Sequence, residues 1–207
     1  EFVAMFITLV PGALGIMLRK VFYPLIFKKI GHGVVFGKNI TLRHPHKIAI
    51  GDNCIIDDNC MLDAKGDTNQ GITIGNGVFI GRNSIVSCKD GNIVLHDNVN
   101  IGFNCDIFSS NAVDIGKDTL LAAYTYIVGG EGYETTPSAT PMQARPIHDT
   151  TKRVDIEADC WLGAGVKVLN GVTIGTGAII GTGAVVTRSI EPNMIAVGIP
   201  AKGLKKR

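Results

Sequence analysis

The sequence has little of what marks several large classes of protein. Over 207 residues the net charge is only +2, charged residues make up 18% of the chain, and aromatic residues make up 6%. No basic face interleaved with aromatic side chains can be traced along the sequence. Because nucleic acids are bound through concentrated positive charge, the sequence predicts no nucleic-acid partner.

Charge is also missing from the N-terminal stretch, where residues 2–18 carry none. Arg19 and Lys20 follow this run, then the apolar stretch "VFYPLIF", then Lys28 and Lys29. The uncharged run is shorter than the about 20 residues that a membrane-spanning helix needs. A helical hairpin that re-enters the membrane or lies in its interface fits better, held to an anionic inner leaflet by the four cations. The alternative is a helix that packs on an open end of the fold or on a partner subunit.

After this N-terminal stretch the chain lacks the three- and four-residue spacing of apolar residues that is typical of an amphipathic helix. Large aliphatic residues recur there at every sixth position instead. A fixed period indicates a solenoid, in which each unit covers the apolar face of the next. Steps of six suit a short strand followed by a turn, repeated three times in a coil of about 18 residues. The aliphatic positions are Ile50, Ile56, Leu62, Ile74, Ile80, Val86, Leu95, Ile101, Ile107, Ile115, Leu121, Ile127, Ile156, Leu162, Val168, Ile174, Ile180 and Val186.

Two further positions of the six-residue unit have predicted roles. The residue two before each aliphatic shares its face of the strand and is slim enough to enter a narrow interior. The residue three after it is Asn, Asp or Gly, which tolerate positive φ and can turn the corner. The slim residues are Cys54, Cys60, Ser84, Cys105, Thr119, Cys160, Ala178 and Ala184. The corner residues are Asn53, Asn59, Gly77, Asn83, Asn98, Asn104, Asp118, Asp159, Gly165, Gly171, Gly177 and Gly183.

The period divides the chain into coils and interruptions. Full coils are predicted at residues 48–65, 72–89, 93–110, 113–130, 154–171 and 172–189, after a partial coil at 34–47. Insertions fall at 66–71, at 90–92 and at 131–153, and the last is a long excursion of the kind that is commonly functional on a rigid scaffold. The expected domains are an apolar, membrane-associated helical segment at 1–33 and a β-helix domain at 34–207.

Five cysteines raise the question of disulfides or zinc. Four of them occupy the slim inward position, so we interpret them as buried reduced thiols that act as small hydrophobes. His44 and His46 in "RHPHK" form one close pair, but a zinc site in a β-helix needs three spaced histidines. No metal is therefore predicted.

The repeats, together with "WLGAGVKVLNGVTIG" and "VVTRSIEPNMIAVGIPAK", resemble the left-handed parallel β-helix acyltransferases in content, spacing and order. Within that family the chain is most similar to sugar and xenobiotic O-acetyltransferases and to the O-acetyltransferases of bacterial surface polysaccharides. The resemblance covers about residues 34–207. The fold class it implies is all-β, a left-handed parallel β-helix solenoid with an N-terminal helical segment. It also implies a homotrimer whose active sites lie between two solenoids, with acetyl-CoA along the C-terminal coils of one of them.

The family's cofactor positions can be carried over to the last coils. By this resemblance a tryptophan and a small residue line the pantetheine channel, hydroxyl residues lie at the same corner of the following coil, and cations near the C-terminus meet the nucleotide phosphates. Exposed backbone amides beside small residues suit a thin pantetheine arm. The positions implied are Trp161, Gly163, Ala164, Gly181, Thr182, Thr187, Arg188, Lys202 and Lys205.

The acceptor side matches the family less completely. Asn104, in "GFNCDI", falls where the family has an asparagine that hydrogen-bonds the acceptor, although the repeat predicts a corner there as well. Where the family has the histidine that takes the proton from the acceptor hydroxyl, this chain has Glu131. Three possibilities stay open: Glu131 is the base, His148 of the same loop replaces it, or the site is impaired.

The resemblance thus implies an acetyl-CoA-dependent O-acetyltransferase acting on a hydroxyl of a sugar or bacterial surface saccharide, either a small molecule or lipid-linked. The expected location is the bacterial cytoplasm at the inner face of the cytoplasmic membrane. A catalytically impaired trimeric saccharide- or CoA-binding scaffold and a serine-acetyltransferase-like enzyme are the alternatives.

Overall fold

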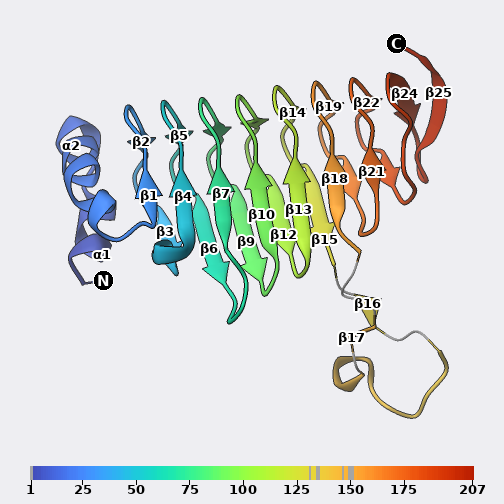
Figure 1. Ribbon diagram of the computed structural model, residues 1–207, viewed down its shortest axis with the longest axis horizontal. Helices are drawn as coiled ribbons and strands as arrows, with labels where there is room; N and C mark the ends of the chain where they lie inside the picture. Colours follow the sequence, from blue (N-terminus) through green and yellow to red (C-terminus); the bar gives the residue numbers. More distant parts are fainter. Residues whose placement is uncertain (1, 131, 134–135, 146, 149–151) are drawn as a thin grey trace.

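The chain winds into a parallel β-helix, as the six-residue period predicts (Figure 1). The computed structural model describes residues 2–130, 132–133, 136–145, 147–148 and 152–207. Each coil contributes one strand to each of three sheets, here called A, B and C, and the strands pair in parallel with equivalent positions aligned. Ile50, for example, pairs with Ile74, and Ile74 pairs with Leu95. The turns between sheets are named the A–B, B–C and C–A corners.

The three sheets run the length of the solenoid. Sheet A contains β1 (Lys29–Ile30), β4 (Ile48–Ile50), β7 (Ile72–Ile74), β10 (Asn92–Leu95), β13 (Ala112–Ile115), β18 (Val154–Ile156) and β21 (Thr173–Ile174). Sheet B contains β2 (Val35–Phe36), β5 (Ile55–Ile56), β8 (Phe79–Ile80), β11 (Asn100–Ile101), β14 (Leu120–Leu121), β19 (Trp161–Leu162), β22 (Ile179–Ile180), β24 (Met194–Val197) and β25 (Lys202–Lys206). Sheet C contains β3 (Thr41–Arg43), β6 (Met61–Lys65), β9 (Ile85–Lys89), β12 (Asp106–Ser109), β15 (Tyr126–Gly129), β20 (Lys167–Val168) and β23 (Val185–Val186).

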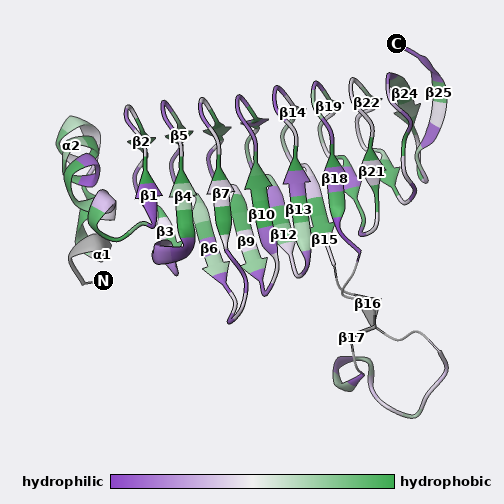
Figure 2. Cartoon of the chain, viewed as in Figure 1, coloured by the Kyte–Doolittle hydropathy of each residue, from purple (hydrophilic) through white to green (hydrophobic). Residues whose placement is uncertain are grey.

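The interior is built as the hexapeptide unit predicts. Every predicted aliphatic and every predicted slim residue is buried, none with more than 2% of its surface exposed. Every predicted corner residue has a positive φ. Figure 2 shows apolar strands and more polar corners repeated from coil to coil. All five cysteines are free and buried, which confirms their interpretation as interior thiols.

The first coil starts earlier than the sequence predicts. The expected partial coil begins at residue 34, but Lys29 and Ile30 already form β1 and pair with β4. Short repeats at the end of a solenoid lack a neighbour on one side, so their sequence pattern is weak. The coil is completed by η2 (Pro45–Lys47), which links β3 to β4.

Two helices close this end of the solenoid. They are α1 (Phe2–Leu9) and α2 (Gly12–Phe22), followed by the short helix η1 (Tyr23–Leu25). Arg19 ties them to the first coil: its Nε donates to the carbonyl of Phe36 at 3.0 Å, and its Nη1 donates to the carbonyls of Ile7 and Val10 at 3.0 and 2.8 Å. The helices thus pack on the open end of the solenoid, and their association with a membrane stays a prediction. No described helix is both long enough and apolar enough to cross a bilayer.

Candidate active site

The B–C corner of the last coils brings five of the predicted cofactor positions together. Trp161 pairs with Ile179 across β19 and β22, and the chain then turns through Gly163 and Ala164. A Cβ on Gly163 would lie 2.7 Å from the backbone nitrogen of Thr182, so only glycine permits this approach of the two coils. Gly181 and Thr182 thus lie directly against Gly163 and Ala164, beside a Trp161 side chain that is half exposed.

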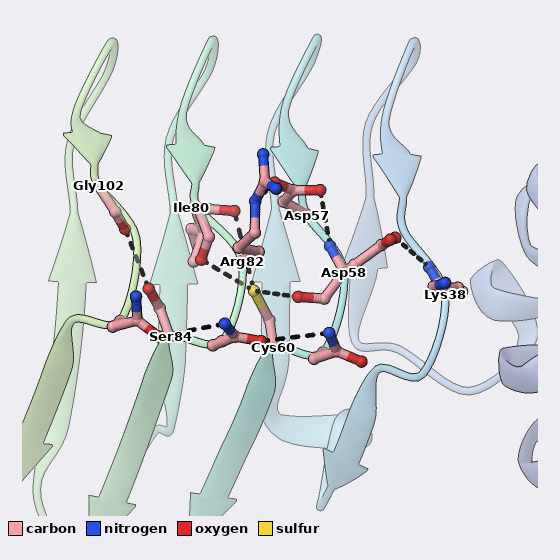
Figure 3. A network of polar contacts seen from close by, with 12 residues as sticks. Lys38, Asp57, Asp58, Cys60, Ile80, Arg82, Ser84 and Gly102 are labelled. Atoms are coloured by element: carbon pink, nitrogen blue, oxygen red, sulfur yellow. Dashed lines mark hydrogen bonds and ion pairs between the residues drawn. The ribbon is translucent and has the colours of Figure 1, made fainter. Parts of the chain in front are cut away.

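This corner has unused hydrogen-bond donors. Within the described residues, the backbone amides of Ala164 and Thr182 donate to no acceptor. The equivalent amide of Lys38, in the first coil, donates to Asp58 Oδ1 at 2.8 Å (Figure 3). In the last two coils no carboxylate accepts from the amide of Ala164, because the equivalent of Asp58 there is Thr182. The amides of Arg82, Phe103 and Ala123, at the same corner of the middle coils, also have no acceptor among the described residues. The two amides of the last coils are available to a ligand as well, and they differ in having only small side chains beside them.

The C-terminal lysines reach this region by way of β25. Lys202 pairs with Val197, and Val197 Cγ1 lies 2.7 Å from the place of a Cβ on Gly181. Lys205 pairs with Ile195, further along the same antiparallel pair. Both lysines are exposed, so they can meet phosphate groups without a desolvation cost.

The corner expected for Thr187 is corrected by the structure. Thr187 and Arg188 follow β23, so they lie at the C–A corner and not with Ala164 and Thr182 at the B–C corner. The reason is that one six-residue step carries the chain around exactly one corner of the coil, and Thr187 is almost one step beyond Thr182.

Asn104 ends a ladder of asparagines along the B–C corner. In each step Nδ2 of one asparagine donates to Oδ1 of the asparagine in the next coil. The distances are 3.0 Å from Asn39 to Asn59, 3.2 Å from Asn59 to Asn83 and 3.1 Å from Asn83 to Asn104. Asn104 has a φ of 54°, so its predicted corner role is confirmed. Its Oδ1 is occupied by the ladder, and its Nδ2 is the group left to meet an acceptor molecule.

Tyr124 is a candidate that the sequence reasoning missed. It occupies the B–C corner between Asn104 and Gly165, with a φ of 63° and 65% of its surface exposed. A bulky residue in the left-handed region is a genuine outlier, and such outliers cluster at functional sites. The available signal was the break in the run of Asn, Asp and Gly at this corner.

The predicted catalytic residues belong to the excursion at the C–A corner. Glu131 lies outside the described residues. In the described part, β16 (Gly132–Tyr133) pairs with β17 (Ile147–His148), which places His148 opposite Gly132, and η3 (Met142–Ala144) lies between them. Figure 1 shows this excursion projecting away from the coils. Within one chain the excursion and the bare B–C corner are therefore at different corners.

Other ionisable clusters do not add a site. His44 Nδ1 lies 3.2 Å from Oδ1 of the buried Asp63, in the first coils. Among the described residues, no group of three or more His, Cys, Asp or Glu side chains could hold a metal ion. Burial raises the pKa of Cys60 and of Cys160 to about 11 each, so these thiols are protonated at neutral pH and are poor nucleophiles.

Three sheets, a slim interior and positive-φ corners define a hexapeptide-repeat β-helix, and comparison with known families agrees. The family model described as "Bacterial transferase hexapeptide (six repeats)" matches residues 153–188. The one described as "Hexapeptide repeat of succinyl-transferase" matches residues 29–64.

Two curated relatives are acetyltransferases. The chain is 32% identical over 121 residues to the putative lipopolysaccharide biosynthesis O-acetyl transferase WbbJ of Escherichia coli (strain K12), covering 56% of this chain and 61% of the relative. It is 30% identical over 157 residues to the galactoside O-acetyltransferase of Lactococcus lactis subsp. lactis (strain IL1403), covering 76% of this chain and 62% of the relative. The chain thus spans less than two thirds of either relative's length. The resemblance found in the sequence is confirmed: the chain is similar to sugar and polysaccharide O-acetyltransferases.

A solved structure shares the fold. It is AntD, an N-acyltransferase from Bacillus cereus, in complex with dTDP and 3-hydroxybutyryl-CoA. The TM-score is 0.60 at 19% identity, and the match covers 92% of this chain and 87% of that chain.

Proposed function

We propose that this protein is an acetyl-CoA-dependent O-acetyltransferase that acts on a hydroxyl of a sugar or bacterial surface saccharide. The observation that carries the proposal is the B–C corner of the last coils, where two free amides lie beside Trp161 in a chain similar to sugar acetyltransferases. The pantetheine arm would run past Gly163, Ala164, Gly181 and Thr182. Lys202 and Lys205 would meet the nucleotide phosphates, with Arg188 at the neighbouring corner.

The reaction is a direct transfer. The acceptor hydroxyl oxygen attacks the thioester carbonyl, an amide stabilises the oxyanion, and the C–S bond breaks as the O-acetyl ester forms. The hydroxyl proton passes to a base and then to the departing CoA sulfur, so that CoA leaves as the thiol. Asn104 Nδ2 would hydrogen-bond the acceptor, and Glu131 or His148 would be the base.

We further propose a homotrimer. In one chain the excursion with the candidate bases lies at the C–A corner, whereas the proposed cofactor site lies at the B–C corner. A neighbouring chain could bring its excursion to this B–C corner. The outer face of sheet B supplies an apolar surface on which a second chain can pack, whereas the outer face of sheet A carries acidic residues such as Asp114 and Asp155. The outward residues of sheet B include Val35, Ile55, Phe79, Leu120, Trp161, Ile179 and Ile195. Light scattering should give three times the chain mass, and a monomer at micromolar concentration would contradict the proposal.

The proposed place of action is the bacterial cytoplasm, at the inner face of the membrane. The support for the membrane location is the N-terminal segment, which is apolar and carries four cations.

The activity is tested by supplying acetyl-CoA and a panel of galactosides and glucosides to the purified protein. Release of the CoA thiol that depends on the sugar, with an acetylated sugar detected by mass spectrometry, is the expected result. CoA binding without sugar-dependent turnover would instead support the impaired scaffold, and transfer to serine would support the serine-acetyltransferase alternative.

The base is tested by two variants of the excursion. Glu131→His restores the family's residue and should raise the rate, within the about 10² to 10⁴ that a positioned base contributes. His148→Ala should remove most activity if His148 supplies the base. A fast wild-type protein that Glu131→His slows and His148→Ala leaves unchanged would assign the base to Glu131.

A further inference from the structure

The helical cap has two faces with different environments. Its inner face packs on the first coil through Arg19 and Tyr23, both buried, and the centroid of the Tyr23 ring lies 4.8 Å from that of the Phe36 ring. Arg19 is only 1% exposed because its donors are taken by three backbone carbonyls. The inner face therefore fixes the cap rigidly on the solenoid.

The outer face of the same cap is apolar and uncovered. Its large side chains are between 38% and 79% exposed, although most soluble surfaces carry such residues only singly. They are Leu9, Leu14, Ile16, Met17, Val21, Phe22 and Leu25. The cap is thus apolar on both sides, and only one side is buried by this chain.

The cap and the first coil carry side-chain charge of one sign in their own sequence. Residues 2–51 contain no Asp or Glu, and the exposed Lys20, Lys28 and Lys29 lie in or directly after the cap. If a second copy of the chain packed on this face, its lysines would lie against the lysines of the first copy, and the repulsion between like charges would be unfavourable. An anionic surface would pair with them instead.

A crevice of about 270 Å³ opens where α2 and η1 meet the first coil. Its lining combines apolar Pro24 and Ile30 with the cationic Lys20, and it also includes His32, which faces Asp52 Oδ1 at 3.6 Å. This combination fits the boundary between acyl chains and phosphate groups in a bilayer, where an apolar and a charged environment meet.

We propose that this outer face docks on an anionic lipid bilayer, with the exposed side chains of α1, α2 and η1 in the interface and the lysines on the headgroups. The helices lie on the membrane, and the coils lead away from it because the cap covers the first coil. The inference deepens the proposed location at the membrane face, and it holds whether or not the chain transfers acetyl groups.

The test is co-sedimentation of the full chain with vesicles of phosphatidylcholine alone or mixed with phosphatidylglycerol. Leu14→Ser/Met17→Ser should weaken partition roughly a hundredfold, because two apolar side chains no longer enter the interface. Ile199→Ser/Leu204→Ser is the matched control: these side chains are also exposed but lie at the other end of the chain, and binding should be unchanged. Circular dichroism shows whether each variant keeps the fold.

Charge is tested with Lys28→Gln/Lys29→Gln, which should lower partition about fivefold per lysine on phosphatidylglycerol vesicles only. Lys65→Gln/Lys117→Gln is its control. Failure of the wild-type chain to sediment with anionic vesicles overturns the proposal. So does an assembly mass that falls in Leu14→Ser/Met17→Ser, because the occupant of the face is then a second copy. Acetyl transfer to a soluble sugar should be unaffected by Leu14→Ser/Met17→Ser, which separates this inference from the proposed activity.

Discussion

The B–C corner is built differently in the first and last coils of the same solenoid. In the first coils it is held by side chains: the asparagine ladder runs outside, and inside Cys60 Sγ donates to the carbonyl of Gly81 at 3.2 Å and Ser84 Oγ to that of Gly102 at 3.0 Å (Figure 3). In the last two coils Gly165 and Gly183 replace the asparagines, and Val166 and Ala184 fill the interior.

The two ends of this corner differ in the size and polarity of their side chains, and we expect this difference to separate stability from binding along one edge. Where asparagines line the corner, their side chains link successive coils to one another. Where the side chains are reduced to Ala, Thr and Gly, backbone hydrogen bonds link the coils at the corner, such as that from the Gly183 amide to the carbonyl of Ala164 at 2.8 Å, and the turn carries no large side chain. The following predictions test that division, from the largest expected effect to the smallest.

A bulky side chain at the bare corner should abolish function without unfolding the protein. Ala164→Trp would fill the proposed pantetheine channel, so acetyl transfer and CoA affinity should fall more than about a hundredfold, equal to at least about 2.7 kcal/mol. Ala164 is partly exposed outside the core, so the melting temperature should change little. Lys38→Trp, at the same corner of the first coil, is the control and should leave CoA binding intact. Unchanged CoA affinity in Ala164→Trp, measured by calorimetry, would place the channel elsewhere.

A break in the ladder should have the opposite effect. Asn59→Ala puts a residue that tolerates the left-handed region less well than asparagine at a φ of 60°, and it removes two side-chain hydrogen bonds, so the free energy of unfolding should fall by about 2 kcal/mol. Asn59→Gly keeps the backbone unstrained and should cost less. Urea unfolding measures both, and equal losses would show that backbone strain is unimportant here.

Asn104 stands where the two regions meet. Asn104→Gly should raise KM for the acceptor about tenfold, or about 1.4 kcal/mol, while KM for acetyl-CoA stays constant. Asn83→Gly, one coil earlier, removes a similar ladder contact and should leave both constants unchanged. A rise in acceptor KM in both variants would indicate a general effect of the ladder.

The interior thiols predict a smaller effect, on alkaline stability. Burial raises the pKa of Cys60 from 9.0 to about 11 in the folded state. The folded protein therefore holds this proton more tightly, and the stabilisation is complete below pH 9 and is lost as pH rises towards 11. Each such thiol should contribute about 1 kcal/mol per pH unit in that window. Cys60→Ala should flatten the pH dependence by that amount, and an unchanged slope between pH 9 and 11 would refute the assignment.

The sequence predicts the coils well because each unit is a local rule. The spacing of Ile50, Ile56 and Leu62 identifies the inward face, and an asparagine three residues later identifies the corner. It predicts the ends and the site less well, because these depend on contacts between distant residues. No short repeat predicts that Arg19 bonds to the first coil, that Tyr124 has a left-handed backbone, or at which corner Thr187 lies. The roles of Glu131 and His148 stay predictions.

The C-terminal strand β25 covers the edge of β24 in the last coil. A parallel solenoid could in principle elongate without limit, since its last coil presents the same strand edges that each earlier coil presents to its successor. In sheet B this edge is not free: β25 folds back antiparallel on β24, and the register shifts between Ile195 and Ala196. A further parallel coil would therefore meet an antiparallel strand with a shifted register in sheet B, which disfavours end-to-end addition of a second molecule at this sheet.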